Sequence, residues 1–149
     1  MQMESGLVQT EIHDHVSVIS LHRRDKKNAF DLALTNALNE ALDQFEEDPD
    51  QWVAVLTGGR DMFSAGSDLK EGSGKTDRGG EYGIIRRKRM KPIVAAAEGL
   101  ALGGGMEILF CCDVLLLRVT SASVCRRLSG ACCQQVVVCF EHFAPYLCM

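Results

Sequence analysis

The residues best suited to a chemical role lie at positions 99–107, which read GLALGGGME: an apolar run, three consecutive glycines and a carboxylate. Glycine inside a helix or strand costs up to about 1 kcal/mol relative to alanine, so three together indicate that the backbone approaches another group closely. The preceding residues 92–97 (PIVAAA) predict a buried strand, and residues 106–112 predict the start of a buried helix. The first turn of such a helix presents free N–H groups to an anion, and Glu107 in that turn is a candidate general base.

A second glycine turn follows another predicted strand. Residues 52–57 (WVAVLT) predict this strand, which runs into Gly58 and Gly59 and then into residues 63–69, FSAGSDL. Each of the two turns therefore offers a bare backbone N–H group. Two such donors that converge on one point can stabilise a developing oxyanion, which is what acyl chemistry requires.

The segments before these turns predict the elements that position them. Two alternating runs, residues 7–12 and 16–21, predict a β-hairpin. Asp31 is a predicted N-cap for a core-facing helix with apolar residues at helical spacing, which continues as far as Pro49. With the strand at 52–57 after it, this order predicts a β-α-β unit with a right-handed parallel crossover.

Three polar segments flank the predicted site. Residues 71–80 contain four glycines, which predicts a mobile loop beside the glycine turns. Residues 82–90 (YGIIRRKRM) predict a short basic amphipathic helix whose four cations are solvated, with contact to a nucleotide as the alternative. Residues 22–30 (HRRDKKNAF) carry four cations in a loop, which indicates either a solvated surface or a contact for phosphate groups.

The composition limits the class of protein. A chain of 149 residues with a net charge of -4 fits one domain and argues against a nucleic-acid or membrane-surface binder. No apolar run approaches the roughly 18 residues of a membrane span. The first residues also lack a signal pattern, so we expect a cytoplasmic protein.

Metal-ligating residues are present but not in convincing patterns. The seven cysteines all lie at or after position 111 and form no C-x-x-C pair, although Cys139 and His142 have the spacing of half a metal site. Without a secretion signal, zinc and disulfide interpretations are both disfavoured. His13 and His15 are interpreted as solvated residues of the hairpin turn rather than as ligands. We therefore expect no metal site.

Three stretches together resemble the enoyl-CoA hydratase/isomerase (crotonase) superfamily. They are RRDKKNAFD at 23–31, FSAGSDLK at 63–70 and EGLALGGGMEI at 98–108. The resemblance covers residues 7–117 and implies an α/β fold, the crotonase-like ββα spiral (ClpP/crotonase type), here truncated. It divides the chain into a partial crotonase-like domain at 1–117 and a non-family tail at 118–149.

The resemblance also implies roles for individual residues. The thioester carbonyl would be polarised by the backbone N–H groups of Ser67 and Gly104, each stabilising the transition state by roughly 3 to 4 kcal/mol. Ser67 stands where the family often has alanine, but the donor is its backbone. Glu107 would be one of two catalytic glutamates; the alternative is a helix-capping residue beside a packing turn. The residues expected along the acyl-CoA are Lys26, Ala29, Ala65, Gly66, Ser67, Asp68, Leu69, Lys70 and Gly104.

The function implied by the resemblance is hydration of 2-enoyl-CoA, as in fatty acid β-oxidation. The coenzyme A thioester is the substrate, no separate cofactor is needed, and the family forms homotrimers or hexamers. No nucleic-acid or membrane partner is expected, and the cationic loop at 22–30 would border the phosphates of coenzyme A. The alternatives are another crotonase-family reaction, such as enoyl-CoA isomerisation, and a non-catalytic remnant or CoA-binding module. A dinucleotide binder is disfavoured because residues 103–105 do not fit the G-x-G-x-x-G spacing.

The second glutamate of a hydratase is not visible in this chain. The family carries it in a phrase close to F-G-L-P-E-V, whereas here Cys112, Asp113 and Val114 lead into an unrelated, cysteine-rich tail. Residues 123–132 can be encoded by TCG GTC TGC CGG AGG TTA AGC GGG GCC TG. With one T in front, the same bases encode F-G-L-P-E-V-K-R-G-L.

We therefore hypothesise a single-base deletion, or an equivalent shift of reading frame, near residues 116–119. The missing glutamate would then lie across the codons of Arg126 and Arg127, and the truncated chain is expected to have poor solubility and little activity. Sequencing the gene around codons 114–135 tests this hypothesis: we expect the family phrase in the alternative frame. An unbroken frame without such a phrase would remove it.

Overall fold

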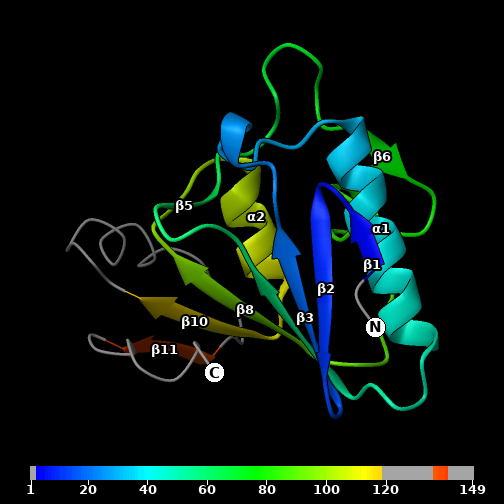
Figure 1. Cartoon of the computed structure of the whole chain (residues 1–149). Coiled ribbons are helices and arrows are strands. Elements are labelled where there is room, and N and C mark those ends of the chain that lie inside the picture. The colour runs from blue at the N-terminus through cyan, green and yellow to red at the C-terminus, as the bar shows by residue number, and fades with distance from the viewer. Residues whose placement is uncertain (1–2, 119–135, 141–149) are drawn as a thin grey trace.

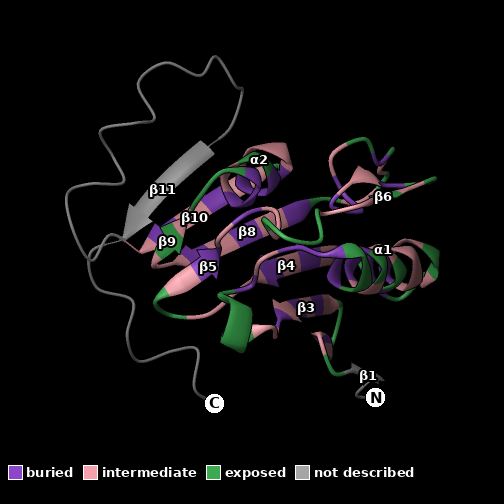
Figure 2. Cartoon of the chain, turned by 90° about the horizontal axis from the view of Figure 1, so that it is seen from above, coloured by how far each residue is buried: buried purple, intermediate pink, exposed green. Residues whose placement is uncertain are grey.

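Seven strands form a central sheet (Figure 1). The computed structural model describes residues 3–118 and 136–140. In sheet order the strands are β1 (Met3–Ser5), β2 (Val8–His13), β3 (Val16–Leu21), β4 (Val53–Thr57), β8 (Ile93–Glu98), β10 (Val114–Arg118) and β11 (Val136–Phe140). The first three strands pair antiparallel, and every later junction is parallel. Buried residues lie along the inner strands and on the helices packed against them, in one core (Figure 2).

The predicted β-hairpin and the helix after it are both confirmed. β2 and β3 pair antiparallel over their full lengths, and His13 and His15 at the turn are exposed. α1 (Leu32–Glu47) begins after Asp31, whose carboxylate accepts a hydrogen bond from the Leu34 amide at 2.8 Å. Because β4 then runs parallel to β3, the predicted β-α-β order holds. The buried residues of α1 are Leu34, Thr35, Leu38, Ala41, Leu42 and Phe45.

The two glycine turns lie at one edge of the sheet. β4 and β8 are parallel neighbours, so their carboxyl ends, and the turns that follow them, point the same way. Beyond this edge β5 (Met62–Ser64) pairs parallel with β9 (Leu100–Ala101). β5 leads into residues 65–68, here the Ser67 turn, and β9 leads into residues 102–105, here the Gly104 turn. α2 (Gly104–Cys111) begins in the second turn, two residues before the predicted helix start.

The segment between the Ser67 turn and β8 differs from the prediction. The expected helix at 82–90 is wrong: residues 82–86 form turns and residues 87–90 form no helix. Tyr82 and Gly83 both adopt left-handed backbone, with φ of 56° and 77°. The expected solvation of the four cations is wrong for Arg87, whose side chain is fully buried and bonds Asp43 at 2.5 Å. Within residues 71–80, β6 (Lys75–Thr76) pairs with β7 (Gly80–Glu81) as a two-stranded ribbon beside α1.

Two other expectations concern membrane-spanning segments and the boundary of the C-terminal tail. No helix in the described region is long and apolar enough to span a membrane. The predicted boundary at 117 and 118 falls within β10, and most of the tail lies outside the described residues. The reading-frame hypothesis therefore stays a prediction.

A largely buried ion-pair network ties the cationic loop to the Ser67 turn. Arg23 contacts Asp31 at 2.8 Å and Asp68 at 3.0 Å, and the three side chains are 10% to 13% exposed. One guanidinium nitrogen also donates to the Ala29 carbonyl at 2.8 Å. Because each carboxylate removed from water needs such compensation, Arg23 serves the fold rather than a solvated surface.

We expect Asp68→Asn to lower the free energy of unfolding at pH 7. Hydrogen bonds from the Lys70 amide and from Arg23 hold the pKa of Asp68 below its ordinary value of 3.8. The ionised carboxylate therefore stabilises the folded state above that value, and this stabilisation is lost as the pH falls through the lower folded-state pKa. Urea unfolding at pH 7 and at about pH 3 measures the effect, because the difference between variant and wild type should shrink at the lower pH. Asp77→Asn, at an exposed carboxylate, is the control; equal effects of the two variants would contradict the assignment.

Candidate active site

The Ser67 turn and the Gly104 turn touch through their backbones. The Leu102 amide donates to the Ser64 carbonyl at 2.9 Å and so extends the β5–β9 pairing. A Cβ added to Gly66 would lie 2.7 Å from the Leu102 oxygen and 2.9 Å from the Gly104 nitrogen, and the residue has φ of 89°. Only glycine fits this position without moving the turns apart.

Both predicted donors are available in this arrangement. Within the part of the chain that the structure describes, the backbone N–H groups of Ser67 and Gly104 donate no hydrogen bond. The amides after them are occupied: Asp68 donates to Phe30 O at 2.8 Å, and Gly105 donates to Leu102 O at 2.9 Å. Gly104 is the first residue of α2, where the partial positive charge of the helix favours an anion. Two unused donors on touching turns meet one requirement of an oxyanion hole, and their convergence on a ligand oxygen stays a prediction.

Glu107 lies in the first turn of α2 and is exposed. Its carboxylate makes no hydrogen bond or ion pair with any described residue. The side chain is therefore free to act as a base on a ligand held at this end of the helix. Its alternative role as a helix cap has no support, since the N-cap is Gly103 and no side chain caps the helix.

The predicted contacts of the acyl chain and pantetheine gather in the Ser67 turn and just beyond it. Gly66 is buried, Ala65 and Asp68 are half-buried, and Leu69 and Lys70 are exposed. The Asp68 carboxylate is already engaged by Arg23 and by the Lys70 amide, at 3.0 Å each. This side chain holds the turn, and its contact with a ligand stays a prediction.

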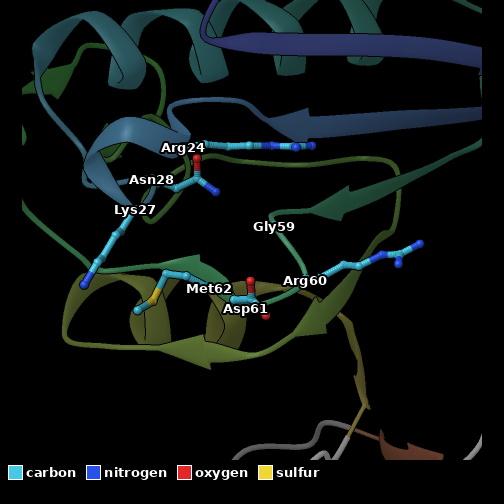
Figure 3. Close-up of a pocket in the computed structure, with 7 residues that line it drawn as sticks. All are labelled: Arg24, Lys27, Asn28, Gly59, Arg60, Asp61 and Met62. Carbon is cyan, nitrogen blue, oxygen red and sulfur yellow. The ribbon is translucent and has the colours of Figure 1, made fainter.

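Lys26 and Ala29, also predicted to contact the ligand, lie in the cationic loop. Lys26 is exposed at the end of a short 3-10 helix (Arg24–Lys26), and the Ala29 carbonyl accepts the bond from Arg23. Between this loop and the connection from β4 to β5 lies an open cavity of about 640 Å³ (Figure 3). Three cations and one carboxylate line it, which favours an anionic group such as a phosphate. Its lining residues are Arg24, Lys27, Asn28, Gly59, Arg60, Asp61 and Met62.

Two residues at the site were not singled out by the sequence. Arg23 was counted only as one of four cations, although the acidic residues at 31 and 68 that flank the motifs could have indicated its partners. Tyr82 is buried, and its hydroxyl lies 2.9 Å from the Ser67 Oγ. No local signal marks it, because the contact depends on the turn that replaces the expected helix. At the preceding residue, hydrogen bonds from the Glu81 backbone amide and from the Lys75 side chain lower the pKa of the Glu81 carboxyl group to about 2.

Metal-ligating side chains do not gather in the described region. No group of three or more histidine, cysteine, aspartate or glutamate residues among the described residues could hold a metal ion. The predicted spacing of Cys139 and His142 lies outside the side chains that the structure describes. The groups that the structure places at and beside the two turns include the two unused amides, the Asp68 carboxylate paired with Arg23 and the Glu107 carboxylate.

Known proteins are similar to this chain in sequence and in fold. The profile of the family described as enoyl-CoA hydratase/isomerase matches residues 11–125. The chain is 37% identical over 124 residues to (E)-benzylidenesuccinyl-CoA hydratase of Thauera aromatica, covering 78% of this chain and 47% of that protein. It is 36% identical over 110 residues to mevalonyl-coenzyme A hydratase of Aspergillus fumigatus, covering 68% of this chain and 41% of that protein.

A solved structure of the same family is similar to this chain in fold. The probable enoyl-CoA hydratase/isomerase of Mycobacterium abscessus aligns with a TM-score of 0.71 at 34% identity, covering 77% of this chain and 46% of that one. This confirms the predicted α/β crotonase-like fold. The chain spans about half the length of the curated relatives it matches, for example 47% and 49% of two of them. It belongs to the enoyl-CoA hydratase/isomerase (crotonase) superfamily, of which it carries an N-terminal portion.

Proposed function

We propose that this chain is a hydratase-like protein that binds acyl-CoA thioesters and polarises the thioester carbonyl between the N–H groups of Ser67 and Gly104. The observation that carries the proposal is that these two unused donors belong to glycine turns in direct backbone contact. The names of the relatives support it, since several are hydratases of CoA thioesters. The basic cavity beside the cationic loop supports a place for the phosphates of coenzyme A.

In the proposed reaction, water adds to C3 of a 2-enoyl-CoA while electron density moves to the thioester oxygen, forming an enolate. The two amides stabilise this oxygen by roughly 3 to 4 kcal/mol each. Glu107 takes a proton from the attacking water, and a second acid must deliver a proton to C2. On the reading-frame hypothesis this chain reads the codons of that acid as Arg126 and Arg127, outside the described residues, and for this reason we expect its activity to be low. No cofactor beyond the thioester takes part, and assembly as a homotrimer or hexamer belongs to the proposal.

A second candidate is a CoA-binding remnant without catalysis. It is favoured by the fact that the sequence printed above contains no phrase like the one that carries the family's second glutamate. This candidate keeps the cavity and the two amides for binding but assigns Glu107 no chemical role.

We expect Glu107→Gln to lower kcat for hydration of crotonyl-CoA by about 100-fold to 10,000-fold, because a general base contributes rate enhancement of this order. The KM should change little, since the isosteric amide keeps the shape of the site. The measurement follows loss of the enoyl thioester absorbance with the full chain. Glu40→Gln, an exposed carboxylate on α1, is the matched control and should leave the rate unchanged.

Three results decide between the candidates. Turnover that Glu107→Gln does not change would contradict the role of Glu107. Binding of crotonyl-CoA without turnover in either form would favour the remnant. A chain that binds no CoA thioester would contradict the proposed function as a whole.

A further inference from the structure

Tyr82 brings a side-chain hydroxyl to the place where the two predicted donors meet. Its Oη lies 2.9 Å from the Ser67 Oγ, and a Cβ added to Gly104 would clash with the same hydroxyl and with the ring carbon that bears it. One hydroxyl therefore contacts both residues whose amides form the proposed oxyanion hole. The tyrosine is only 7% exposed, and its ring packs edge-to-face on Phe30 with centroids 5.4 Å apart.

The backbone of Tyr82 is held in a conformation that residues with a Cβ disfavour. Its φ of 56° lies in the left-handed region, where a bulky side chain is a genuine outlier. Such strain persists where surrounding contacts determine it, and it is concentrated at functional sites. This observation alone assigns no role, but it shows that the fold maintains this tyrosine position at a cost.

Contacts on both sides fix the strained segment. Before Tyr82, Glu81 contacts Lys75 and Arg86, at 3.0 Å each. After it, the buried Arg87 donates to the Gly83 carbonyl at 3.3 Å and to the Asn39 side chain at 2.7 Å. These contacts therefore hold the turn that carries the tyrosine hydroxyl, and an oxyanion donor needs to be pre-organised in this way.

The pair of hydroxyls has the donors and acceptors needed to act on a ligand. A hydroxyl both donates and accepts, so the Ser67 Oγ–H can donate to the Tyr82 Oη and leave the phenolic proton free. A carbonyl oxygen has two lone pairs, which the two amides occupy, whereas an enolate oxygen carries more charge and can accept a third hydrogen bond. A third donor would therefore act more strongly on the transition state than on bound substrate, which is the condition for raising kcat.

We propose that Tyr82 is a third hydrogen-bond donor to the thioester oxygen, and that the Ser67 side chain is a positioning residue that orients its hydroxyl. The proposal rests on the function proposed above, because it needs an acyl-CoA whose carbonyl lies between Ser67 and Gly104. The competing explanation is that the ring only fills the space beside Gly104. Tyr82→Phe separates the two, since it keeps the ring and removes the hydroxyl.

The test uses butyryl-CoA with ¹³C at the thioester carbonyl, a saturated thioester that cannot be hydrated. Its carbonyl stretching frequency in isotope-edited infrared spectra falls when hydrogen bonds polarise the bound carbonyl. We expect a smaller fall in Tyr82→Phe than in wild type at nearly equal affinity, and an intermediate fall in Ser67→Ala. We also expect Tyr82→Phe to lower kcat for crotonyl-CoA by about 100-fold, the lower limit for an oxyanion donor, with little change in KM.

The control is Ser17→Ala in β3, which also removes a buried hydroxyl, bonded to Gln51 at 2.8 Å, and should leave the spectrum unchanged. If Tyr82→Phe does not fold, as judged by circular dichroism, the Ser67→Ala spectrum carries the test. A carbonyl frequency that is the same in wild type and in the folded site variants overturns the role of Tyr82 and leaves the proposed function intact. A wild-type chain that binds no butyryl-CoA overturns both.

Discussion

The site depends on a short parallel pairing between two segments that leave the main sheet, β5 and β9. Met62 pairs with Leu100 and Ser64 with Ala101, and the ladder continues in the bond from Leu102 to Ser64. Because β4 and β8 are parallel neighbours, the chain leaves the sheet at the same edge after each of them, and the next segments, β5 and β9, can pair. The two turns after it are therefore close before any side chain acts, and the absence of a Cβ at Gly66 lets their backbones touch.

Two side-chain contacts hold the Ser67 turn, one from a residue before it in the sequence and one from a residue after it. Arg23 reaches it from the loop before α1, through Asp68, and its second contact with Asp31 links the same ion pair to the start of that helix. Tyr82 reaches it from the segment before β8, through the Ser67 hydroxyl. The side chains that make these two contacts are largely buried. An ion pair or hydrogen bond there is screened little by water, and leaving one partner unpaired is costly. The position of the amide at Ser67 is therefore a property of the whole fold.

Local patterns predicted the elements that local energetics decide. The hairpin, the capped helix after Asp31 and the strands before both glycine turns all follow the periodicity of their residues. The segment at 82–90 has the same kind of apolar and basic pattern, yet a buried guanidinium at Arg87 and left-handed backbone at Tyr82 replace the helix. Those features depend on contacts with residues of α1 and of the Ser67 turn, which lie outside the local sequence at 82–90. The glycine turns and Glu107 were found because motif spacing marks them, whereas Arg23 and Tyr82 act through contacts far along the chain.

Because the proposed donors are backbone groups, the residue type at position 67 does not decide whether the proposed oxyanion hole can form. An amide N–H is present whatever the side chain, so the constraint on Ser67 comes from the turn geometry and not from its hydroxyl. The hydroxyl is then free to take a second task, and in this chain it contacts Tyr82 at 2.9 Å. An alanine at this position would leave a buried phenol without that partner, which carries a desolvation penalty. Serine at position 67 and tyrosine at position 82 are therefore best understood as one polar unit beside Gly104.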